Sequence, residues 1–374
     1  MTRPRVVVAG LGDTGVLSAI RLARFADVVA ISTKPGWLSG QELGLRLARP
    51  ERWQRDYRID FDRFRGLDGV RIVQGSAIGL DVAARTLRLR DDAGIESEEP
   101  YDALVIATGV SNGFWRDPRL QGAGQIDHAL AAAHRRIASA ATVAIVGGGP
   151  AAASTAAQVA ERWPEKTVHL YFPRERALPH HHHRVWSQVA DRLQGLGVAL
   201  HPNHRAVVPA SASGELAGGP IRWSSGQPDA EADAVVWAVG AVRPHTSWLP
   251  EDLLDEQGFV RVAPTLQVPG ADGVFAVGDV AATDPLRTSA RNQGHKLVAA
   301  NVRAHLLGRR LRAYRPPGRR WGSVLGAQAD GLQVFAPNGR AFRFPVWSVD
   351  PVLQRFVVRR GIYGGVRPSP PRSM

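Results

Sequence analysis

The feature that most constrains the fold is a glycine-rich turn that occurs twice, each time between an apolar run and a helical pattern. The first turn is Gly10-Leu11-Gly12-Asp13-Thr14-Gly15, and it follows the β-branched run Arg5–Ala9. The second is Gly147-Gly148-Gly149-Pro150-Ala151-Ala152, and it follows Thr142–Val146. In such a turn the first glycine permits a tight bend, the second lets backbone N–H groups approach a diphosphate, and the third position lets helix and strand pack closely. This repeat predicts an α/β protein with two Rossmann-like dinucleotide-binding domains.

Further apolar segments complete the two units. In the first, residues 28–31 form a second strand, and residues 101–106 form a buried strand that ends in Ala107-Thr108-Gly109. In the second, residues 167–172 form the second strand, and a later strand ends at Gly240. The predicted domains are residues 1–112 and 241–310 for the first nucleotide-binding domain, 113–240 for the second, and 311–374 for a small, basic, β-rich C-terminal region.

The composition limits the chemistry that such a protein can perform. The chain has no cysteine, which excludes disulfides, iron–sulfur clusters, thiolate nucleophiles and dithiol relays. Electrons must therefore pass through a bound cofactor. No segment approaches the roughly 18 consecutive apolar residues of a membrane-spanning helix, and no secretory signal precedes the first strand. We therefore expect a cytoplasmic protein.

The first turn departs from the usual dinucleotide site in two ways. Asp13 places a carboxylate among the N–H groups that would bind a diphosphate, and it would repel phosphate unless it points outward as a helix cap. The second strand ends in Ile31-Ser32-Thr33-Lys34, without the acidic residue that usually binds the adenosine ribose. We expect the hydroxyl of Ser32 or Thr33, together with Lys34, to replace that acid.

The second turn leaves the choice between two nicotinamide nucleotides open. Its second strand leads into Pro173-Arg174-Glu175-Arg176, again without an acid at the strand tip. An acid there would bind the ribose of NAD, whereas arginines would meet the 2′-phosphate of NADP. Arg174 and Arg176 therefore favour NADPH, and Glu175 keeps NADH open. In the alternative interpretation these residues form a solvated loop.

A third strand tip carries the carboxylate of Gly278-Asp279. A carboxylate in this position can accept hydrogen bonds from the ribityl hydroxyls of a flavin. A helical pattern over residues 289–307 follows, and near Asn292-Gln293 its N-terminus could direct its dipole at the flavin pyrimidine. The structural alternative is that Asp279 only caps a helix.

An internal run of four histidines, His180 to His183, is the one metal-like motif. Consecutive residues on a regular element cannot all face one ion, so we expect no metal site. We predict an exposed lead into a helix over residues 185–193.

Positive charge is concentrated at the C-terminal end. The net charge is +13, and from Arg309 onward there are 13 arginines against only Asp330 and Asp350. Aromatic residues lie among these arginines: Trp321, Phe335, Phe342, Phe344, Trp347 and Phe356. Three interpretations remain open: a small aromatic core under a solvated basic surface, a surface that contacts anionic lipid, and, least favoured, nucleic-acid binding through phosphates.

Together these motifs resemble the two-dinucleotide-binding-domain flavoproteins of the pyridine nucleotide–disulfide oxidoreductase superfamily. The resemblance is strongest to the branch of ferroptosis suppressor protein and apoptosis-inducing factor, and it spans residues 5–325. The supporting segments are residues 6–15, 107–109, 143–152, 163–166, 238–240, 266–268, 274–279 and 313–316. One departure is Ser154, where that branch has a glutamate near the nicotinamide.

The resemblance implies an FAD-dependent NAD(P)H oxidoreductase that passes electrons to a small, quinone-like acceptor without a redox disulfide. The alternative is a flavin- and nucleotide-binding sensor with slow or no turnover. No residue is assigned as a catalytic acid or base. The cofactor-binding residues would be Gly10, Gly12, Gly15, Ser32, Lys34, Thr108, Gly109, Gly147, Gly149, Ala152, Arg174, Arg176, Gly240, Gly278, Asp279, Asn292 and Gln293.

Overall fold

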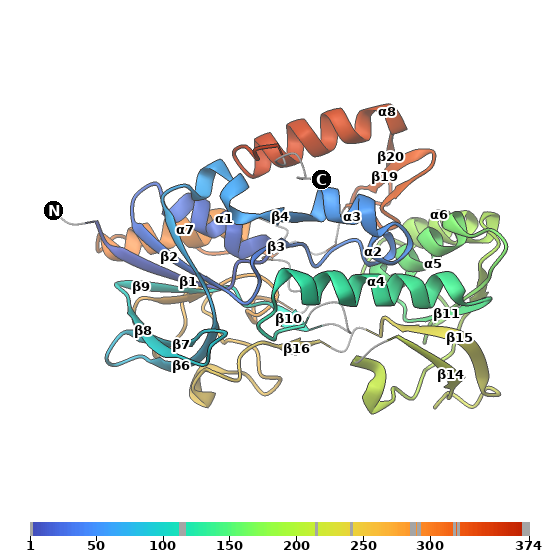
Figure 1. Cartoon of the computed structure of the whole chain (residues 1–374), viewed down its shortest axis with the longest axis horizontal. Helices are drawn as coiled ribbons and strands as arrows, with labels where there is room; N and C mark the ends of the chain where they lie inside the picture. The colour runs from blue at the N-terminus through green and yellow to red at the C-terminus, as the bar shows by residue number, and fades with distance from the viewer. Residues whose placement is uncertain are drawn as a thin grey trace.

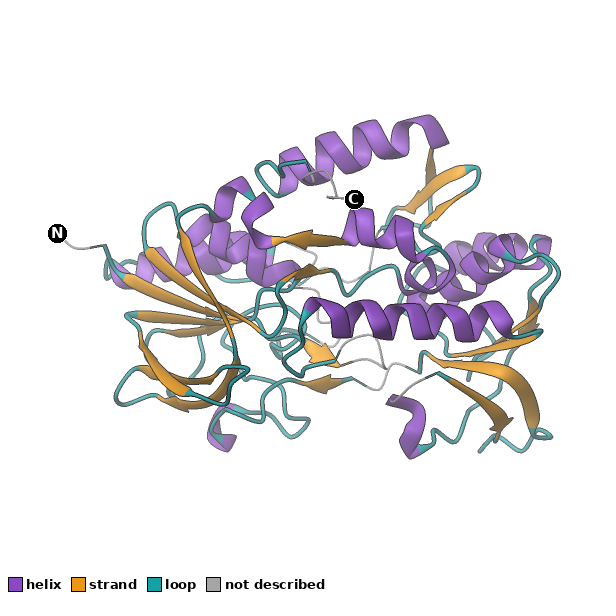
Figure 2. Ribbon diagram, in the orientation of Figure 1, coloured by secondary structure: helices purple, strands orange, loops and turns teal. Residues whose placement is uncertain are grey.

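The computed structural model shows two α/β units side by side, with the C-terminal segment lying across both (Figures 1 and 2). It describes residues 3–111, 117–213, 216–239, 242–284, 289, 293–316, 319 and 322–368. Of the predicted site residues, Gly240 and Asn292 lie outside these ranges.

The first unit is built on a five-stranded parallel sheet in the order β17-β9-β1-β2-β5. Its strands are β1 (Arg5–Ala9), β2 (Asp27–Ser32), β5 (Val70–Gln74), β9 (Ala103–Ile106) and β17 (Val274–Ala276). The central strands are apolar except at their ends because both faces are covered. Helices α1 (Asp13–Leu22) and α7 (Gly294–Leu306) cover one face, and an antiparallel sheet of β6 (Ser76–Asp81), β7 (Thr86–Arg90) and β8 (Glu96–Pro100) covers the other.

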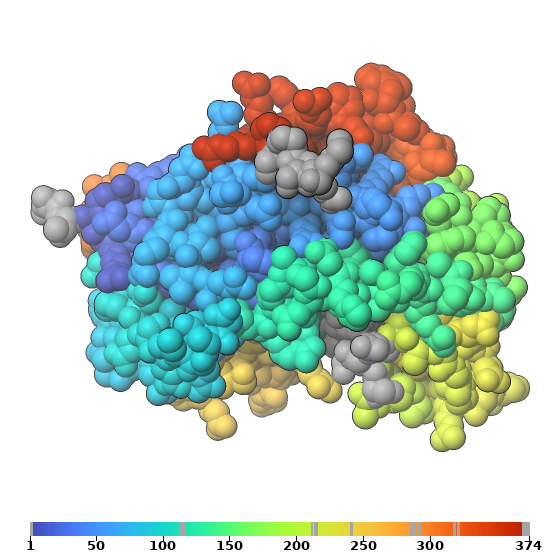
Figure 3. Space-filling view, viewed as in Figure 1, coloured from blue at the N-terminus to red at the C-terminus, as the bar shows by residue number. Residues whose placement is uncertain are grey.

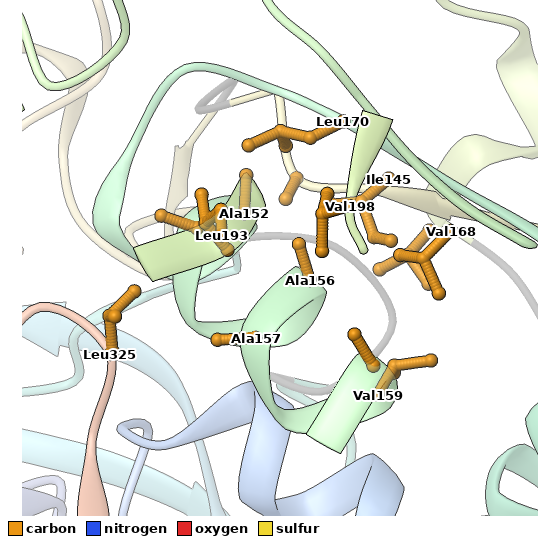
Figure 4. Packing of buried hydrophobic residues seen from close by; sticks show 14 of the residues in the cluster. Ile145, Ala152, Ala156, Ala157, Val159, Val168, Leu170, Leu193, Val198 and Leu325 are labelled. Carbon is orange, nitrogen blue, oxygen red and sulfur yellow. The ribbon is translucent and has the colours of Figure 1, made fainter. Parts of the chain in front are cut away.

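The second unit repeats this plan with the strand order β13-β12-β11-β15-β14. Its strands are β11 (Thr142–Val146), β12 (Thr167–Tyr171), β13 (Ala199–His201), β14 (Ala217–Ile221) and β15 (Ala230–Trp237), and only β14 is antiparallel to its neighbour. Helices α5 (Pro150–Arg162) and α6 (His183–Gly195) pack on one face. Small alanines on α5 let it lie close to the sheet (Figure 4). The predicted pair of Rossmann-like units is therefore confirmed.

Several short elements join the units. The chain leaves the first unit through β10 (Val110–Ser111) and returns through β16 (Arg243–Pro244), which pairs with β10 in antiparallel fashion. Helix α4 (Ala123–Ser139) follows the first crossing. The other connecting elements are β3 (Gly36–Leu38), α2 (Leu43–Ala48), α3 (Pro50–Tyr57), β4 (Arg58–Asp60), η1 (Phe61–Arg63), η2 (Arg65–Leu67), η3 (Ala210–Ser213) and η4 (Glu251–Leu253).

The helix predicted over residues 289–307 is shorter in the structure. Helix α7 begins at Gly294 because Gln293, the residue before it, has a left-handed backbone with φ 61°. The domain boundaries at residues 112, 240 and 310 stay predictions.

The C-terminal segment (residues 322–368) is β-rich only in its first part, which corrects the prediction. It contains the sheet of β18 (Ala327–Gln328), β19 (Gly331–Phe335) and β20 (Ala341–Phe344), then the short helix α8 (Val346–Ser348) and the π-helix η6 (Val349–Ile362). Figure 3 shows this segment, in red, reaching from the first unit to the second. Among the described residues no helix is both long and apolar enough to cross a bilayer.

The C-terminal segment has no aromatic core of its own. Phe335 is buried, but it packs into the core of the second unit together with Leu325, which lies beside α5 in Figure 4. Tyr363 is buried in the core of the first unit. Phe342, Trp347 and Phe356 are 57%, 74% and 63% exposed. The expectation of a small aromatic core is therefore wrong for these three residues, because the segment spreads over two larger cores.

Candidate functional site

A cleft of about 1790 Å³ is lined by residues of both units and of η6. Ligand pockets commonly measure about 300–1000 Å³, so this cleft has room for more than one small ligand. The predicted site residues on its wall are Gly10, Gly12, Ser32, Lys34, Thr108, Gly109, Gly278, Asp279 and Gln293. Residues separated by as many as 283 positions in the chain thus meet at one surface.

The first glycine turn has the geometry of a diphosphate cradle. Gly10 has φ +100°, and a Cβ on it would lie 2.6 Å from the carbonyl oxygen of Ala107. A Cβ on Gly15 would overlap the carbonyl oxygen of Gly10, so this position must be glycine for the helix to approach the strand. A Cβ on Gly12 would meet no described atom within 4 Å. The turn therefore has no room for a side chain at its first and third glycines, whereas the second glycine faces open space in the cleft.

Asp13 does not cap helix α1. The N-cap is Gly12, and Asp13 Oδ2 accepts a hydrogen bond of 3.3 Å from the backbone N–H of Gly40. This contact ties the cradle to the loop before α2.

Ser32, Thr33 and Lys34, the residues expected to replace the ribose-binding acid, all line the cleft at the end of β2. Ser32 is buried, and its Oγ accepts a hydrogen bond of 3.1 Å from the N–H of Lys34. The Lys34 ammonium donates to the carbonyl oxygen of Arg119. Burial lowers the pKa of Lys34 to about 8, and nearby Asp117 opposes this shift. Both side chains lie on the cleft wall, but each already has a partner within the chain.

The Thr108-Gly109 turn is held by hydrogen bonds to His245, which directly follows β16. His245 Nδ1 lies 2.9 Å from the Thr108 carbonyl oxygen, which can only accept, so Nδ1 carries the proton. His245 Nε2 is then the acceptor for the Ser111 hydroxyl at 2.7 Å. The Thr108 hydroxyl donates to the His245 carbonyl oxygen at 2.9 Å. These bonds fix the turn against both crossing strands.

Beyond β17, Gly278 and Asp279 lie at the strand tip predicted to bind a flavin. The backbone N–H of Gly278 donates to Ser289 Oγ at 3.1 Å, and a Cβ on Gly278 would come within 3.3 Å of Thr14. This places the strand tip against the first cradle. His295, in the first turn of α7, is buried on the cleft wall, and its Nδ1 has no partner among the described residues. Burial lowers the pKa of His295 to about 4.

The second glycine turn repeats the cradle geometry. A Cβ on Gly147 would overlap the carbonyl oxygen of Ala238, whereas a Cβ on Gly149 would meet no described atom within 4 Å. Ala152 is fully buried against the turn. Gly147, Gly149 and Ala152 are not on the cleft wall, but Ala151 and Ser154 of the same helix are. The glycine turn of the second cradle therefore lies off the cleft wall, whereas the first turns of α5 line the cleft.

Arg174 and Arg176 are exposed on the loop after β12 and do not line the cleft. The loop is nevertheless adjacent to the second turn, because the N–H of Leu178 donates to the Gly148 carbonyl oxygen at 2.7 Å. Desolvation lowers the pKa of His182, and neighbouring cations that include Arg176 lower it further. This edge of the second unit is thus positively charged.

The histidine run leads into a helix, as predicted, but the helix already begins at His183, and the expected exposure is wrong for His181, which is buried. His182 is the N-cap of α6, and its ring nitrogen accepts a hydrogen bond from the N–H of Arg184. The capping role explains one of the four histidines.

Sequence reasoning missed part of the cleft wall. Glu42 lies on it, as do Trp37 and Tyr57 of the first unit and Tyr363, which directly follows η6. Burial raises the pKa of Tyr57 well above the usual range, and the nearby carboxylate of Glu42 raises it further. No motif marked these residues, because they come together only through the packing of η6 on the first unit.

Comparison with known proteins identifies the family to which the chain belongs. A family model described as pyridine nucleotide-disulphide oxidoreductase matches residues 4–302. The chain is a member of that family. This confirms the superfamily suggested by the glycine turns and strand tips.

The sequence similarity to individual relatives extends over different shares of the chain. It is 31% identical to oxidoreductase ptaL of Pestalotiopsis fici, over 58% of this chain and 57% of that protein. It is 28% identical to the type II NADH:quinone oxidoreductase Ndh of Mycobacterium tuberculosis, over 64% of this chain and 59% of that protein. It is 26% identical to ferroptosis suppressor protein 1 of Xenopus tropicalis, over 83% of each. The chain thus spans less than two thirds of the first two relatives.

Among solved structures, the fold is similar to that of the sulfide:quinone oxidoreductase of Aquifex aeolicus. The TM-score is 0.72 at 16% identity, and the match covers 98% of this chain and 93% of the other. The similarity includes the C-terminal segment, which the family model does not reach.

Proposed function

We propose that this protein is an FAD-dependent NAD(P)H oxidoreductase that passes electrons to a quinone-type acceptor without a redox disulfide. The observation that carries the proposal is the pair of diphosphate cradles, each closed at its first glycine and open at its second. Membership of the pyridine nucleotide-disulphide oxidoreductase family supports the cofactors, and the name of the mycobacterial relative supports the acceptor. The absence of cysteine requires a route without thiols.

The chain's residues would bind and orient, and the cofactor would supply the redox chemistry. The first cradle, with Gly10 and Gly12 at its mouth, would hold the FAD diphosphate at the N-terminus of α1. Asp279 would accept hydrogen bonds from the ribityl chain. The second cradle would hold the nicotinamide nucleotide at the N-terminus of α5. A bound flavin takes two electrons from a dihydronicotinamide and gives them to an acceptor.

The acceptor is tested by steady-state oxidation of NADH and NADPH with a panel of quinones of increasing side-chain length, with ferricyanide and oxygen as alternatives. We expect quinones to support the fastest turnover. Turnover with oxygen or ferricyanide that exceeds every quinone would contradict the acceptor class while leaving the cofactors in place.

Arg176 is proposed to favour NADPH by pairing with its 2′-phosphate. Replacing it, as Arg176→Ser, should raise the KM for NADPH about tenfold and change the KM for NADH less than about twofold, because only NADPH carries the phosphate. Arg24→Ser removes another exposed arginine, which lies just after α1 and far from the second cradle in the sequence, and is the control. Equal changes for both nucleotides would show that Arg176 acts only through the overall charge.

The outer surface of the C-terminal segment is proposed to contact anionic lipid. Val346, Trp347 and Phe356 are 55%, 74% and 63% exposed, and the guanidinium of Arg360 lies 5.9 Å from the Phe356 ring centroid. Arg355 is exposed beside them. Apolar side chains flanked by arginines fit the boundary between headgroups and acyl chains of an anionic bilayer.

The double variant Trp347→Ser/Phe356→Ser should therefore lower sedimentation with anionic vesicles about tenfold, because two exposed aromatic side chains no longer enter the bilayer. Ile95→Ser, which removes another side chain exposed to 65%, should change nothing. Vesicles of neutral lipid should bind neither form. Tight binding to DNA across a range of salt concentrations, with none to vesicles, would favour the nucleic-acid interpretation.

A further inference from the structure

Helix α2 begins from a strained residue on the cleft wall. Its N-cap, Glu42, has φ 58° and ψ 47°, a left-handed backbone conformation that residues other than glycine rarely adopt. N-cap residues usually have an extended backbone. Such strain persists where the surrounding packing determines the conformation, and it concentrates at functional sites. The carboxylate of Glu42 is therefore held at a defined place on the wall.

The packing that holds Glu42 is the crossing of α2 over α5. A Cβ on Gly44 would lie 2.5 Å from the carbonyl oxygen of Ser154, so the two helix backbones are in direct contact there. Because Glu42 precedes Gly44 by two residues, this contact fixes it beside the first turns of α5. The cleft wall contains Glu42 together with Ala151 and Ser154 of α5.

Glu42 and Ser154 also meet the same stretch of the C-terminal segment. The Ser154 hydroxyl donates to the carbonyl oxygen of Leu325 at 3.3 Å. Glu42 Oε2 occupies the space where a Cβ on Gly326 would lie, and Gly326 has φ +73°. The Ser154 hydroxyl and the Glu42 carboxylate thus contact Leu325 and Gly326, which are adjacent in the chain. The carboxylate of Glu42 therefore lies close to the Ser154 side chain.

We infer that Glu42 stabilises the positive charge that develops on the nicotinamide ring during hydride transfer; this rests on the proposed function. Pro150 at the start of α5, Ser154 and Glu42 all line the cleft, so a dinucleotide that extends from the N-terminus of α5 into the cleft would lie near both side chains. When the C4–H bond of the dihydronicotinamide breaks, the hydride carries both electrons to the bound flavin, and the ring becomes a pyridinium cation. A fixed carboxylate beside the ring lowers the energy of that cation and gains no proton.

The test compares oxidised and reduced nucleotide with the FAD-loaded protein. Glu42→Gln keeps the shape of the side chain and removes its charge. Titration calorimetry with NAD(P)⁺, which involves no turnover, should show a Kd about tenfold higher than wild type, because the cationic ring loses its counter-charge. The single-turnover rate of flavin reduction by NAD(P)H should fall about tenfold for the same reason. Glu51→Gln, which neutralises an exposed acid on α3, should change neither value.

A second variant tests whether the effect of Glu42→Gln comes from the lost charge or from a change in structure. Ser154→Glu in the Glu42→Gln background should restore most of the NAD(P)⁺ affinity and of the reduction rate, because it returns a carboxylate to the same space. Wild-type behaviour of Glu42→Gln, or no rescue by Ser154→Glu, would overturn the inference while reduction of the wild-type flavin leaves the proposed function standing. If NAD(P)H does not reduce the wild-type flavin, the proposed function fails, and the NAD(P)⁺ titration alone decides the role of Glu42.

Discussion

Gly12→Val is expected to give a folded protein that is purified without flavin. A Cβ at this position meets no described atom within 4 Å, and the backbone, with φ −75° and ψ −164°, is open to any residue. The side chain would therefore fill only the space in which a diphosphate must lie. The visible absorbance of the purified protein, before and after incubation with FAD, measures the effect.

The matched variant is Gly149→Val in the second cradle, where the backbone is likewise extended and the Cβ space likewise open among the described residues. This protein should be yellow, with full flavin content, but its flavin should not be reduced by NADH or NADPH. Melting temperatures should separate the two, because only the first variant loses the stabilisation that a bound ligand provides. If Gly12→Val retained flavin and Gly149→Val lost it, the two cradles would be assigned in the wrong order.

Tyr363→Ala is expected to lower the free energy of unfolding by about 3 kcal/mol, near the usual cost of truncating a buried aromatic residue. Tyr363 is 6% exposed, and its ring packs edge-on at 5.3 Å from both Trp37 and Phe64. These contacts attach the end of η6 to the first unit, so the truncation should also make the C-terminal segment sensitive to protease. Denaturant titration and limited proteolysis measure the two effects.

Phe356→Ala is the control for this prediction. Phe356 lies in η6, the helix that Tyr363 directly follows, but is 63% exposed, so its truncation should change the unfolding free energy by less than about 0.5 kcal/mol. Similar losses in the two variants would mean that Tyr363 does not anchor η6 more firmly than a surface residue does.

The sequence predicted those parts of the fold that depend on local patterns. The strand, the glycine turn and the following helix are contiguous, so Gly10 to Gly15 and Gly147 to Ala152 could be recognised without any long-range contact. The structure gives physical reasons for these residues, since a Cβ on Gly10 or Gly147 would meet the backbone of a strand that lies far away in the sequence. A tight turn can thus be predicted from the sequence even where the distant residues that pack against it cannot.

The rest of the cleft depends on packing between distant segments and could not be predicted. Asp13 was expected either to repel phosphate or to cap α1, but it accepts a hydrogen bond from Gly40, a partner that no spacing rule identifies. Tyr363 and Glu42 reach the cleft through η6 and α2, which carry no nucleotide-binding motif. The aromatic residues of the C-terminal segment were misjudged for a related reason. Composition alone does not distinguish Phe335, which enters a neighbouring core, from Trp347, which stays exposed.

The central claim is that a nicotinamide nucleotide held at the second cradle reduces a flavin held at the first, and rapid mixing of the FAD-loaded protein with NAD(P)H under anaerobic conditions tests it most directly. The account predicts that the visible absorbance of the flavin bleaches within seconds, at one reduced flavin per chain. Bleaching over many minutes would instead support a slow nucleotide sensor. A purified protein that stays colourless after incubation with FAD would contradict the account altogether.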